Sequence, residues 1–460
     1  MTHPSRFAGL LAATTIGTYV LLAAGATRAV TRAAASCATW PVCEGRLLAP
    51  AGPALAIAWA HRVTAAVVGV AVVAVVVLAW RRGEPRRVRY ALGGVAVLYP
   101  VQVVIGAVAA TGGADGAVAA VHLTVAMTIF SALVVALAWT LEPEATDAPD
   151  VAPRGPADAG AAPGETASGG GSLGPVETLR AYVRLTKPRL MWLLCLVAAA
   201  GMALAAGPSL RVRTVVLTLV GGVLAIGASG TFNHVFERDR DREMSRTADR
   251  PVATDALPRR NAAAFGVALA ATSLAVFAQV NLLVAALGLT AILYYSVVYT
   301  LLLKPNTVQN TVVGGFAGSL PALIGWAAVT GGVALPGLVL AAVIFLWTPA
   351  HFYNLALAYR EDYARGGFPM LPVVRGESVT HKHILGYLGA TLLAAAALVA
   401  VSPLGPLAAA TSVAFGAVFL YTVVRLHHER DRAAAFRAFH ASNAYLGALL
   451  LAVVVDALVV

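Results

Sequence analysis

The sequence predicts an all-α polytopic membrane protein of about thirteen transmembrane helices, with a four-helix module followed by a nine-helix bundle. Two observations carry this prediction. First, 59% of the 460 residues are hydrophobic and only 12% are charged, whereas soluble domains usually contain roughly 25% charged residues. Second, apolar stretches near or above the roughly 20 residues needed for a bilayer-crossing helix recur along the whole chain.

We expect four spans before the middle of the chain and nine after it. They lie at about 7–27, 55–80, 90–110, 117–141, 189–206, 213–233, 262–279, 282–303, 308–329, 335–353, 384–401, 404–424 and 442–460. A cleaved signal peptide is the alternative for the first span. Arg28 and Arg32 interrupt the approach to the small-residue stretch AAASC, and further spans follow, so we favour a retained helix.

The formal charge of +11 raises nucleic acid as an alternative partner, but the basic residues gather in loops between spans. One loop holds Arg81, Arg82, Arg86, Arg87 and Arg89, and another holds Arg238, Arg240, Arg242, Arg246, Arg250, Arg259 and Arg260. Positive loops favour the cytoplasm, which places the N-terminus inside and the C-terminus outside. Arg28, Arg32 and Arg46 run against this trend in an outer loop. We expect a multi-pass protein of the cell membrane and no nucleic-acid partner.

Residues 142–177 are rich in Pro, Gly, Ala, Ser and Asp. Such a composition cannot bury enough apolar surface to offset chain entropy, so it indicates a flexible linker. Four preceding spans place this linker in the cytoplasm. We therefore divide the chain into a module at 1–141, a linker at 142–177 and a domain at 178–460.

The segment TFNHVFERDRDREMSRTADRP follows a long apolar span. Asn233, Glu237 and Asp241 have i, i+4, i+8 spacing, which places them on one stripe of a helix. Their oxygen atoms suit Mg²⁺, which prefers a few carboxylates together with phosphate oxygens. Arg246 and Arg250 follow, and arginine has the geometry to hold diphosphate oxygens. The alternative is a solvated loop of salt bridges.

A second segment, WTPAHFYNLALAYREDYARGGFPMLPVV, also ends a span. His351 and Asp362 are eleven residues apart, about three turns, and share a face if the helix is unbroken. Glu361 points away and is the weaker ligand candidate. Pro349 predicts a kink or break within the run. The alternative role for His351 is to pack between helices.

The intervening segment contains Lys304, with Gln309 and Asn310 close behind it at the cytoplasmic interface. We assign Lys304 to the anion site. Gly314, Gly315 and Gly318 are assigned to close helix packing, the ordinary reason for small residues in a span.

From about residue 180 onward the chain resembles the intramembrane prenyltransferase (UbiA) superfamily, and within it the protohaem IX farnesyltransferases. The resemblance rests on LTKPR, the acidic stripe followed by RTADRP, KPNTVQN with GGFAG, and the WTPAHF to PMLP run. It implies nine helices around a cavity, with Mg²⁺ as cofactor and with farnesyl diphosphate and haem b as substrates. Four positions depart from the family pattern: Glu237 in place of the commoner Asp, Ala358 in place of an acid, and Ala350 and Tyr353, which give TPAHFY in place of TPPHFW.

The resemblance also implies roles for single residues. The metal and catalytic set is Asn233, Glu237, Asp241 and Asp362; the diphosphate set is Lys187, Arg246, Arg250 and Lys304; the haem or prenyl set is Gln309, Asn310, His351 and Tyr353. A prenyltransferase with a quinone or lipid acceptor, and a non-catalytic haem-binding assembly factor, are the alternatives. A transporter is disfavoured because the polar groups gather at one surface and not at the midplane.

In the first module, Cys37 and Cys43 lie in a predicted outer loop and are candidates for a disulfide. His61 and His122 each lie about six residues into a span that enters from the outer face, so both sit about 9 Å deep by helix rise. Equal depth suits haem ligation by two histidines. The alternative is two histidines that pack between helices.

The module resembles one half of the haem A synthases. The resemblance rests on SCATWPVC, WAHR, and VQVVIG followed by HL. It implies bound haem b, with haem A synthase or terminal oxidase assembly proteins as partners. Ala58 stands where that family has a carboxylate, and only four of its eight spans are present, so we do not expect oxidation of haem O by this module.

Overall fold

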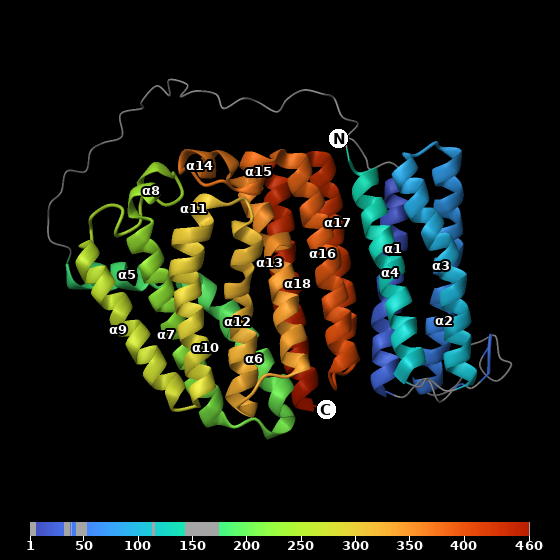
Figure 1. Cartoon of the computed structure of the whole chain (residues 1–460), viewed down its shortest axis with the longest axis horizontal. Helices are drawn as coiled ribbons and strands as arrows, with labels where there is room; N and C mark the ends of the chain where they lie inside the picture. Colours follow the sequence, from blue (N-terminus) through green and yellow to red (C-terminus); the bar gives the residue numbers. More distant parts are fainter. Residues whose placement is uncertain are drawn as a thin grey trace.

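The computed structural model describes residues 6–31, 37, 39–42, 53–112, 116–142 and 174–459. Within these ranges every regular element is a helix, and thirteen helices are long and apolar enough to cross a membrane. The predicted fold class and number of spans are therefore confirmed. Because thirteen is odd, the chain begins at one face of the bundle, which we call the N face, and ends at the opposite C face (Figure 1).

The first four spans form the N-terminal module. They are α1 (Arg6–Thr31), α2 (Pro53–Arg81), α3 (Arg86–Thr111) and α4 (Gly116–Thr140). Helix α1 contacts α2 and α4, and α3 contacts the same two helices. The four helices thus form a ring in which α2 and α4 occupy opposite corners.

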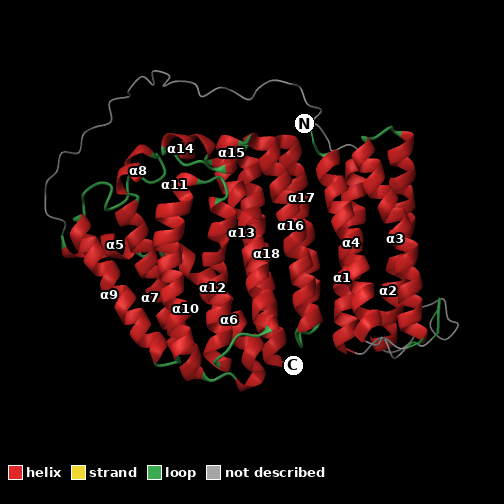
Figure 2. Ribbon diagram, viewed as in Figure 1, coloured by secondary structure: helices red, strands yellow, loops and turns green. Residues whose placement is uncertain are grey.

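The remaining nine spans form the C-terminal domain, which Figure 2 shows as long helices with loops at both faces. They are α6 (Pro188–Ala206), α7 (Val212–Phe236), α9 (Arg259–Ala278), α10 (Leu282–Leu293) continued by η3 (Tyr294–Leu303) and α11 (Lys304–Asn306), α12 (Asn310–Thr330), α13 (Leu335–Ala358), α16 (Gly376–Val401), α17 (Pro406–Glu429) and α18 (Arg432–Val459). The short helices are α5 (Pro175–Leu185), η2 (Gly207–Ser209), α8 (Arg238–Glu243), α14 (Arg360–Arg365) and α15 (Leu371–Val374).

Two spans begin earlier than their hydropathy predicts. Helix α16 starts at Gly376 where the sequence predicts 384, and α18 starts at Arg432 where it predicts 442. In both cases the first turns contain charged residues, such as Glu377 and Lys382 in α16 and Arg432 and Arg437 in α18. Such turns lie at the interface, where water and headgroups solvate charged side chains, so hydropathy alone places the start too late.

The predicted linker is shorter than expected at both ends. Glu142 is paired with Arg87 and with Lys382, and Pro175 already begins α5. The predicted flexibility of the rest falls on residues 143–173, which lie outside the described ranges.

Glycines set the closest helix contacts in the C-terminal domain. A Cβ on Gly314 would lie 2.5 Å from the ring of Tyr299, and one on Gly315 would lie 3.2 Å from a backbone oxygen, in agreement with the predicted packing role. The tightest approach joins α6 to α12, where a Cβ on Gly325 would lie 2.1 Å from the carbonyl oxygen of Ala198. These helices pack nearly backbone to backbone, as small residues allow in membranes.

The N-terminal module packs against one side of the C-terminal domain. Helix α1 contacts α16 and α17, and α4 contacts α16. Within this interface, the buried hydroxyls of Tyr19 and Ser412 are hydrogen-bonded at 2.6 Å. At the N face, Lys382 of α16 is paired with Glu142, which follows α4. The two modules therefore share one continuous core.

Candidate active site

The predicted acidic stripe lies where α7 passes into α8 at the N face. The amide of Glu237 donates to the carbonyl of Asn233 at 2.9 Å, and the amide of Asp241 donates to that of Glu237 at 2.8 Å. The i to i+4 pattern thus continues across the helix junction and keeps the three side chains on one face. Asn233, Glu237 and Asp241 are 2%, 5% and 2% exposed. The stripe is therefore buried, and the solvated-loop alternative is wrong for these residues.

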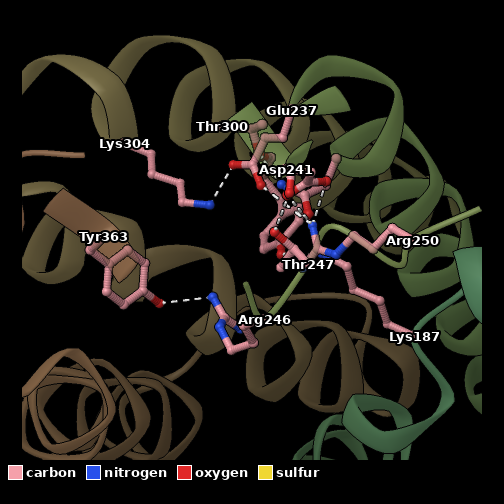
Figure 3. A network of polar contacts seen from close by, with 11 residues as sticks. Lys187, Glu237, Asp241, Arg246, Thr247, Arg250, Thr300, Lys304 and Tyr363 are labelled. Atoms are coloured by element: carbon pink, nitrogen blue, oxygen red, sulfur yellow. Dashed lines mark hydrogen bonds and ion pairs between the residues drawn. The ribbon is translucent and has the colours of Figure 1, made fainter. Parts of the chain in front are cut away.

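Each member of the stripe contacts a cation, and Figure 3 shows those beside Glu237 and Asp241. Lys304 Nζ lies 2.5 Å from Glu237 Oε1. Arg250 Nη1 donates to both oxygens of Asp241 at 2.8 Å. Lys187 donates to the side-chain oxygen of Asn233. Three of the four predicted ligand residues and three of the four predicted diphosphate residues thus form one charged cluster, which draws on α7, α8, α11 and the loops before α6 and after α8.

The charges of this cluster change the pKa values of its members. Burial alone would raise the pKa of Glu237, but Lys304, Lys187 and Arg250 hold it below its usual value. At Asp241 the effect of burial is larger than the opposing effect of the Arg250 charge, so the pKa of that carboxyl is raised. Burial, reinforced by Arg250, lowers the pKa of Lys187 to about 7. A close arrangement of carboxylates and ammonium groups is thus held in a low-dielectric environment, where each interaction is stronger than in water.

A π-helix brings η3 into this cluster. The hydroxyl of Thr300 donates to the carbonyl of Tyr295, five residues earlier, at 2.8 Å. The side-chain amide of Asn233 donates to Thr300 at 3.4 Å, and Lys187 donates to the hydroxyl of Tyr295 at 3.4 Å. Wide π turns are rare and gather at functional sites. The sequence gives no signal of this segment, because its residues read as an ordinary apolar span.

Asp362 lies on α14 and contacts the loop after α8. Its Oδ1 accepts hydrogen bonds from the amide and the hydroxyl of Ser245 at 2.8 and 2.7 Å, and its Oδ2 accepts from the amide of Arg246 at 3.2 Å. Burial opposes ionisation, but the Ser245 hydrogen bonds and Arg365 hold the pKa of Asp362 below its usual value. Asp362 thus fixes the position of Arg246. Its predicted role as a metal ligand stays a prediction.

His351 and Asp362 do not share one helix, so that expectation is wrong. Helix α13 is continuous through Pro349 and ends at Ala358, and the chain turns at Tyr359 before α14. His351 instead stacks between Trp347 and Phe439, with ring centroids 4.2 and 4.4 Å away. The break comes ten residues after the proline that we expected to cause it.

The other predicted haem or prenyl residues lie apart from the charged cluster. Asn310 is fully buried and donates to the carbonyl of Thr307 at 2.7 Å, which closes the turn before α12. Gln309 is exposed beside it. Tyr353 is 1% exposed, with its ring 6.2 Å from that of His383. Within the described ranges, no hydrogen bond joins these three side chains to the cluster.

The donor set of the stripe fits Mg²⁺. Among the described residues, no group of three or more His, Cys, Asp or Glu side chains gathers into a metal site. Two carboxylates and an amide oxygen nevertheless suit this ion, which takes one or two protein carboxylates and completes its shell with substrate phosphate and water. The protein thus supplies part of a coordination shell beside cations that attract phosphate.

In the N-terminal module, Cys37 is disulfide-bonded and Cys195 is free; Cys43 lies outside the described residues. Arg62 donates to the carbonyls of Thr39 and Cys37 at 2.6 and 3.2 Å and so attaches this loop to α2.

The two predicted haem-ligating histidines lie toward the C face. His61 faces Gly25 of α1, and His122 faces Gly106 of α3. Nε2 of His122 lies 3.2 Å from the side-chain nitrogen of Gln102. That contact has to open before this nitrogen can bind iron.

The fold and the charged cluster define an integral-membrane prenyltransferase, and the comparison with known proteins agrees. Residues 194–447 match the UbiA prenyltransferase family, and the chain belongs to it. A full-length relative from Haloarcula marismortui, named protoheme IX farnesyltransferase, is 60% identical and covers 100% of both chains. Residues 8–162 match a family described as cytochrome oxidase assembly protein.

Two further comparisons bear on the division of the chain. A protoheme IX farnesyltransferase from Nostoc is 43% identical over 62% of this chain and 90% of its own. That share of the chain is the size of the C-terminal domain. A solved digeranylgeranylglyceryl phosphate synthase has the same fold, with a TM-score of 0.53 at 15% identity, over 62% of this chain and 100% of that one.

Proposed function

We propose that the protein transfers the farnesyl group of farnesyl diphosphate to a vinyl group of haem b, giving haem O and diphosphate. The observation that carries this proposal is the buried pairing of Glu237 with Lys304 and of Asp241 with Arg250 at one face of the bundle. The full-length relative named for this reaction, at 60% identity, supports the choice of substrates. The positive loops support a cytoplasmic position for this face. We place the protein in the plasma membrane.

The donor site is formed by the charged cluster. Lys187, Arg250 and Lys304 would turn from their present partners to the diphosphate oxygens, and Arg246 joins them from the loop that Asp362 holds. Glu237 and Asp241, with Asn233, would hold Mg²⁺, which when bound would supply further positive charge to the leaving diphosphate. Because the carboxylates already face cations, exchanging partners costs less than creating charge in a dry site.

The reaction proceeds by ionisation of the allylic C–O bond. The electron pair leaves with the diphosphate, whose charge the cluster neutralises, and an allylic cation remains inside the bundle. The terminal carbon of a haem vinyl group attacks this cation and forms the new C–C bond. Water adds to the resulting cation beside the porphyrin and loses a proton, which leaves a hydroxyethylfarnesyl group.

His351 is proposed as a haem-binding residue. The hydroxyl of Ser442 donates to the carbonyl of Phe439 at 2.7 Å and lies 2.7 Å from His351 Nδ1. The single proton of this hydroxyl is used in the hydrogen bond to Phe439, so the hydroxyl has to accept the proton of His351 Nδ1. The lone pair of the imidazole is therefore on Nε2. That nitrogen is the one that an iron ion could use. Gln309, Asn310 and Tyr353 would shape the surrounding binding region.

The N-terminal module is proposed to bind haem b through His61 and His122. A haem there would lie toward the C face, where α2 and α4 begin, whereas the charged cluster lies at the N face. We therefore favour storage of haem, or docking of haem A synthase or terminal oxidase assembly proteins, over delivery of substrate.

The experiment is expression in a host that lacks its own haem O synthase, followed by haem extraction and mass analysis. Haem O should appear, and its mass gives the length of the added chain. A prenylated quinone or lipid without haem O would instead support the other acceptor class, and no prenylated product would support the non-catalytic alternative.

A further inference from the structure

A second polar pocket lies at the N face, on the other side of α13 from the acidic stripe. Four helix ends surround a cavity of about 80 Å³, lined by Leu357 of α13, Glu377 and His381 of α16, Leu426 of α17, Arg430 and Asp431 of the following turn, and Arg432 and Ala435 of α18. We call this the arginine pocket. No role discussed so far uses these residues.

Two buried imidazoles in this region have unsatisfied nitrogens. His381 is 2% exposed and lines the pocket, and His427 is 5% exposed with its ring 5.1 Å away. Nδ1 of His381 and Nε2 of His427 have no hydrogen-bond partner. Nδ1 of His427 lies 2.8 Å from the carbonyl of Val423 and so carries the proton. Buried polar atoms without partners are rare in folded proteins, and a bound group is one explanation.

Two arginines and two carboxylates line the pocket, and Arg360 outside the lining adds one positive charge. Glu377 is paired with Arg360 at 3.2 Å, and Asp431 accepts a hydrogen bond from the amide of Ala434 at 2.6 Å. By contrast, no ion pair joins Arg430 or Arg432 to a carboxylate within the described ranges. Arg430 is the left-handed C-cap of α17, with φ of 50°, and its Nε donates to the carbonyl of His427 at 3.1 Å.

One tyrosine separates this pocket from the donor site. The guanidinium of Arg432 lies 5.0 Å from the centre of the Tyr359 ring, and that of Arg246 lies 5.2 Å from the same ring. Each cation makes a favourable cation–π contact with this ring. A ligand in the arginine pocket would therefore lie beside the loop that we assign to diphosphate.

The pocket is lined by α13 and α18, the two helices that also hold His351 and Phe439. Leu357 follows His351 by six residues on α13, which is about 9 Å of rise toward the N face but about 240° of turn, so the two side chains lie on different sides of that helix. On α18, Ala435 precedes Phe439, which stacks on His351, by one turn and about 40°. An amphipathic ligand could therefore place an acidic edge in the pocket and extend its apolar body along α18 toward Phe439.

We propose that the arginine pocket binds the two propionate carboxylates of the acceptor haem. The proposal rests on the function proposed above. Arg430 and Arg432 would pair with the carboxylates, and His381 would donate from Nδ1, the nitrogen without a partner. Propionates and vinyl groups occupy opposite edges of protohaem. Holding the acidic edge at the aqueous face therefore leaves the vinyl edge inside the bundle, where a prenyl cation is protected from water.

The test compares haem b with its dimethyl ester, in which both carboxylates are blocked. The full-length protein carries His61→Ala and His122→Ala so that only the acceptor site contributes, and binding is followed by absorbance. We expect haem b to bind about tenfold more tightly than the ester, because charged hydrogen bonds are lost on esterification. Arg430→Gln with Arg432→Gln should abolish this preference while leaving the affinity for the ester unchanged, which also shows that the variant is folded.

Arg425→Gln is the matched control, because Arg425 lies on the same face and is paired with Glu429 outside the pocket. It should keep the preference. Equal binding of haem b and its ester by the parent protein overturns the proposal, even where haem O is still formed. A lipid phosphate is the other source of an anion: stabilisation by anionic nanodiscs that depends on Arg432, with no preference for free carboxylates, also overturns it.

Discussion

The two modules place their candidate binding residues at opposite faces, charged in the C-terminal domain and uncharged in the N-terminal module. In the C-terminal domain, carboxylates and cations meet at the N face, with Lys304 2.5 Å from Glu237 and Arg250 2.8 Å from Asp241. In the N-terminal module, two imidazoles lie toward the C face among apolar helices and glycines. The first arrangement suits a highly charged ligand that exchanges ion-pair partners. The second suits a flat, mostly apolar ligand held by neutral nitrogens.

The largest expected effect concerns the charged cluster of the C-terminal domain. Glu237→Gln or Asp241→Asn should reduce prenyl transfer by at least about 100-fold, since each removes a ligand charge and leaves a buried cation without its partner. Haem O production in a host without its own synthase measures the effect. Asp239→Asn is the control, because that neighbouring carboxylate has 79% of its side chain exposed. Full activity of both stripe variants contradicts the assigned site.

The next largest effect concerns the two histidines of the N-terminal module. Residues 1–145, purified alone, should show the absorption spectrum of a six-coordinate haem, and His61→Ala or His122→Ala should each remove it, because either change leaves one axial position open. An unchanged spectrum would rule out these ligands. Formation of haem A by the full-length chain alone would show that the module oxidises haem O, contrary to our expectation.

A smaller effect follows from the Lys187 ammonium. Its pKa of about 7 means that it loses its charge as the pH rises above neutrality. Binding an anion favours the charged form, so affinity for farnesyl diphosphate should be full at pH 6 and fall by at most about tenfold by pH 8. KM measured across this range should therefore rise in the wild type. Lys187→Arg, which stays charged, should flatten the profile; a parallel rise in the variant would assign the titration to another group.

The smallest effect concerns the junction of the two modules. A chain that begins at Gly174 should form haem O within about twofold of the full-length rate, because the charged cluster lies wholly in the C-terminal domain. Its thermal midpoint should fall, since α16 and α17 lose the contacts of α1, including the hydrogen bond between Tyr19 and Ser412. An inserted but inactive truncation would show that the N-terminal module contributes to the transfer.

The sequence predicts what depends on local spacing. The i, i+4, i+8 pattern places Asn233, Glu237 and Asp241 correctly because α7 and α8 keep one register. It does not predict which cation meets which acid, since Lys304 and Glu237 lie 67 residues apart and meet only through the fold. It also misses the break at Tyr359, because nothing in the residues around it interrupts the helical pattern. The resemblance to a family identified Lys187, but not that this lysine binds Asn233.

The interface between the modules also limits which neighbours the enzyme can have. Helix α1 and the end of α4 cover α16 and α17 along one side of the nine-helix domain. That side is therefore closed to any other protein in the membrane, as long as the buried Tyr19–Ser412 contact holds. A protein that collects the lipophilic product has to approach along the remaining circumference. Joining the modules in one chain thus removes one side of the domain from those through which the product can leave.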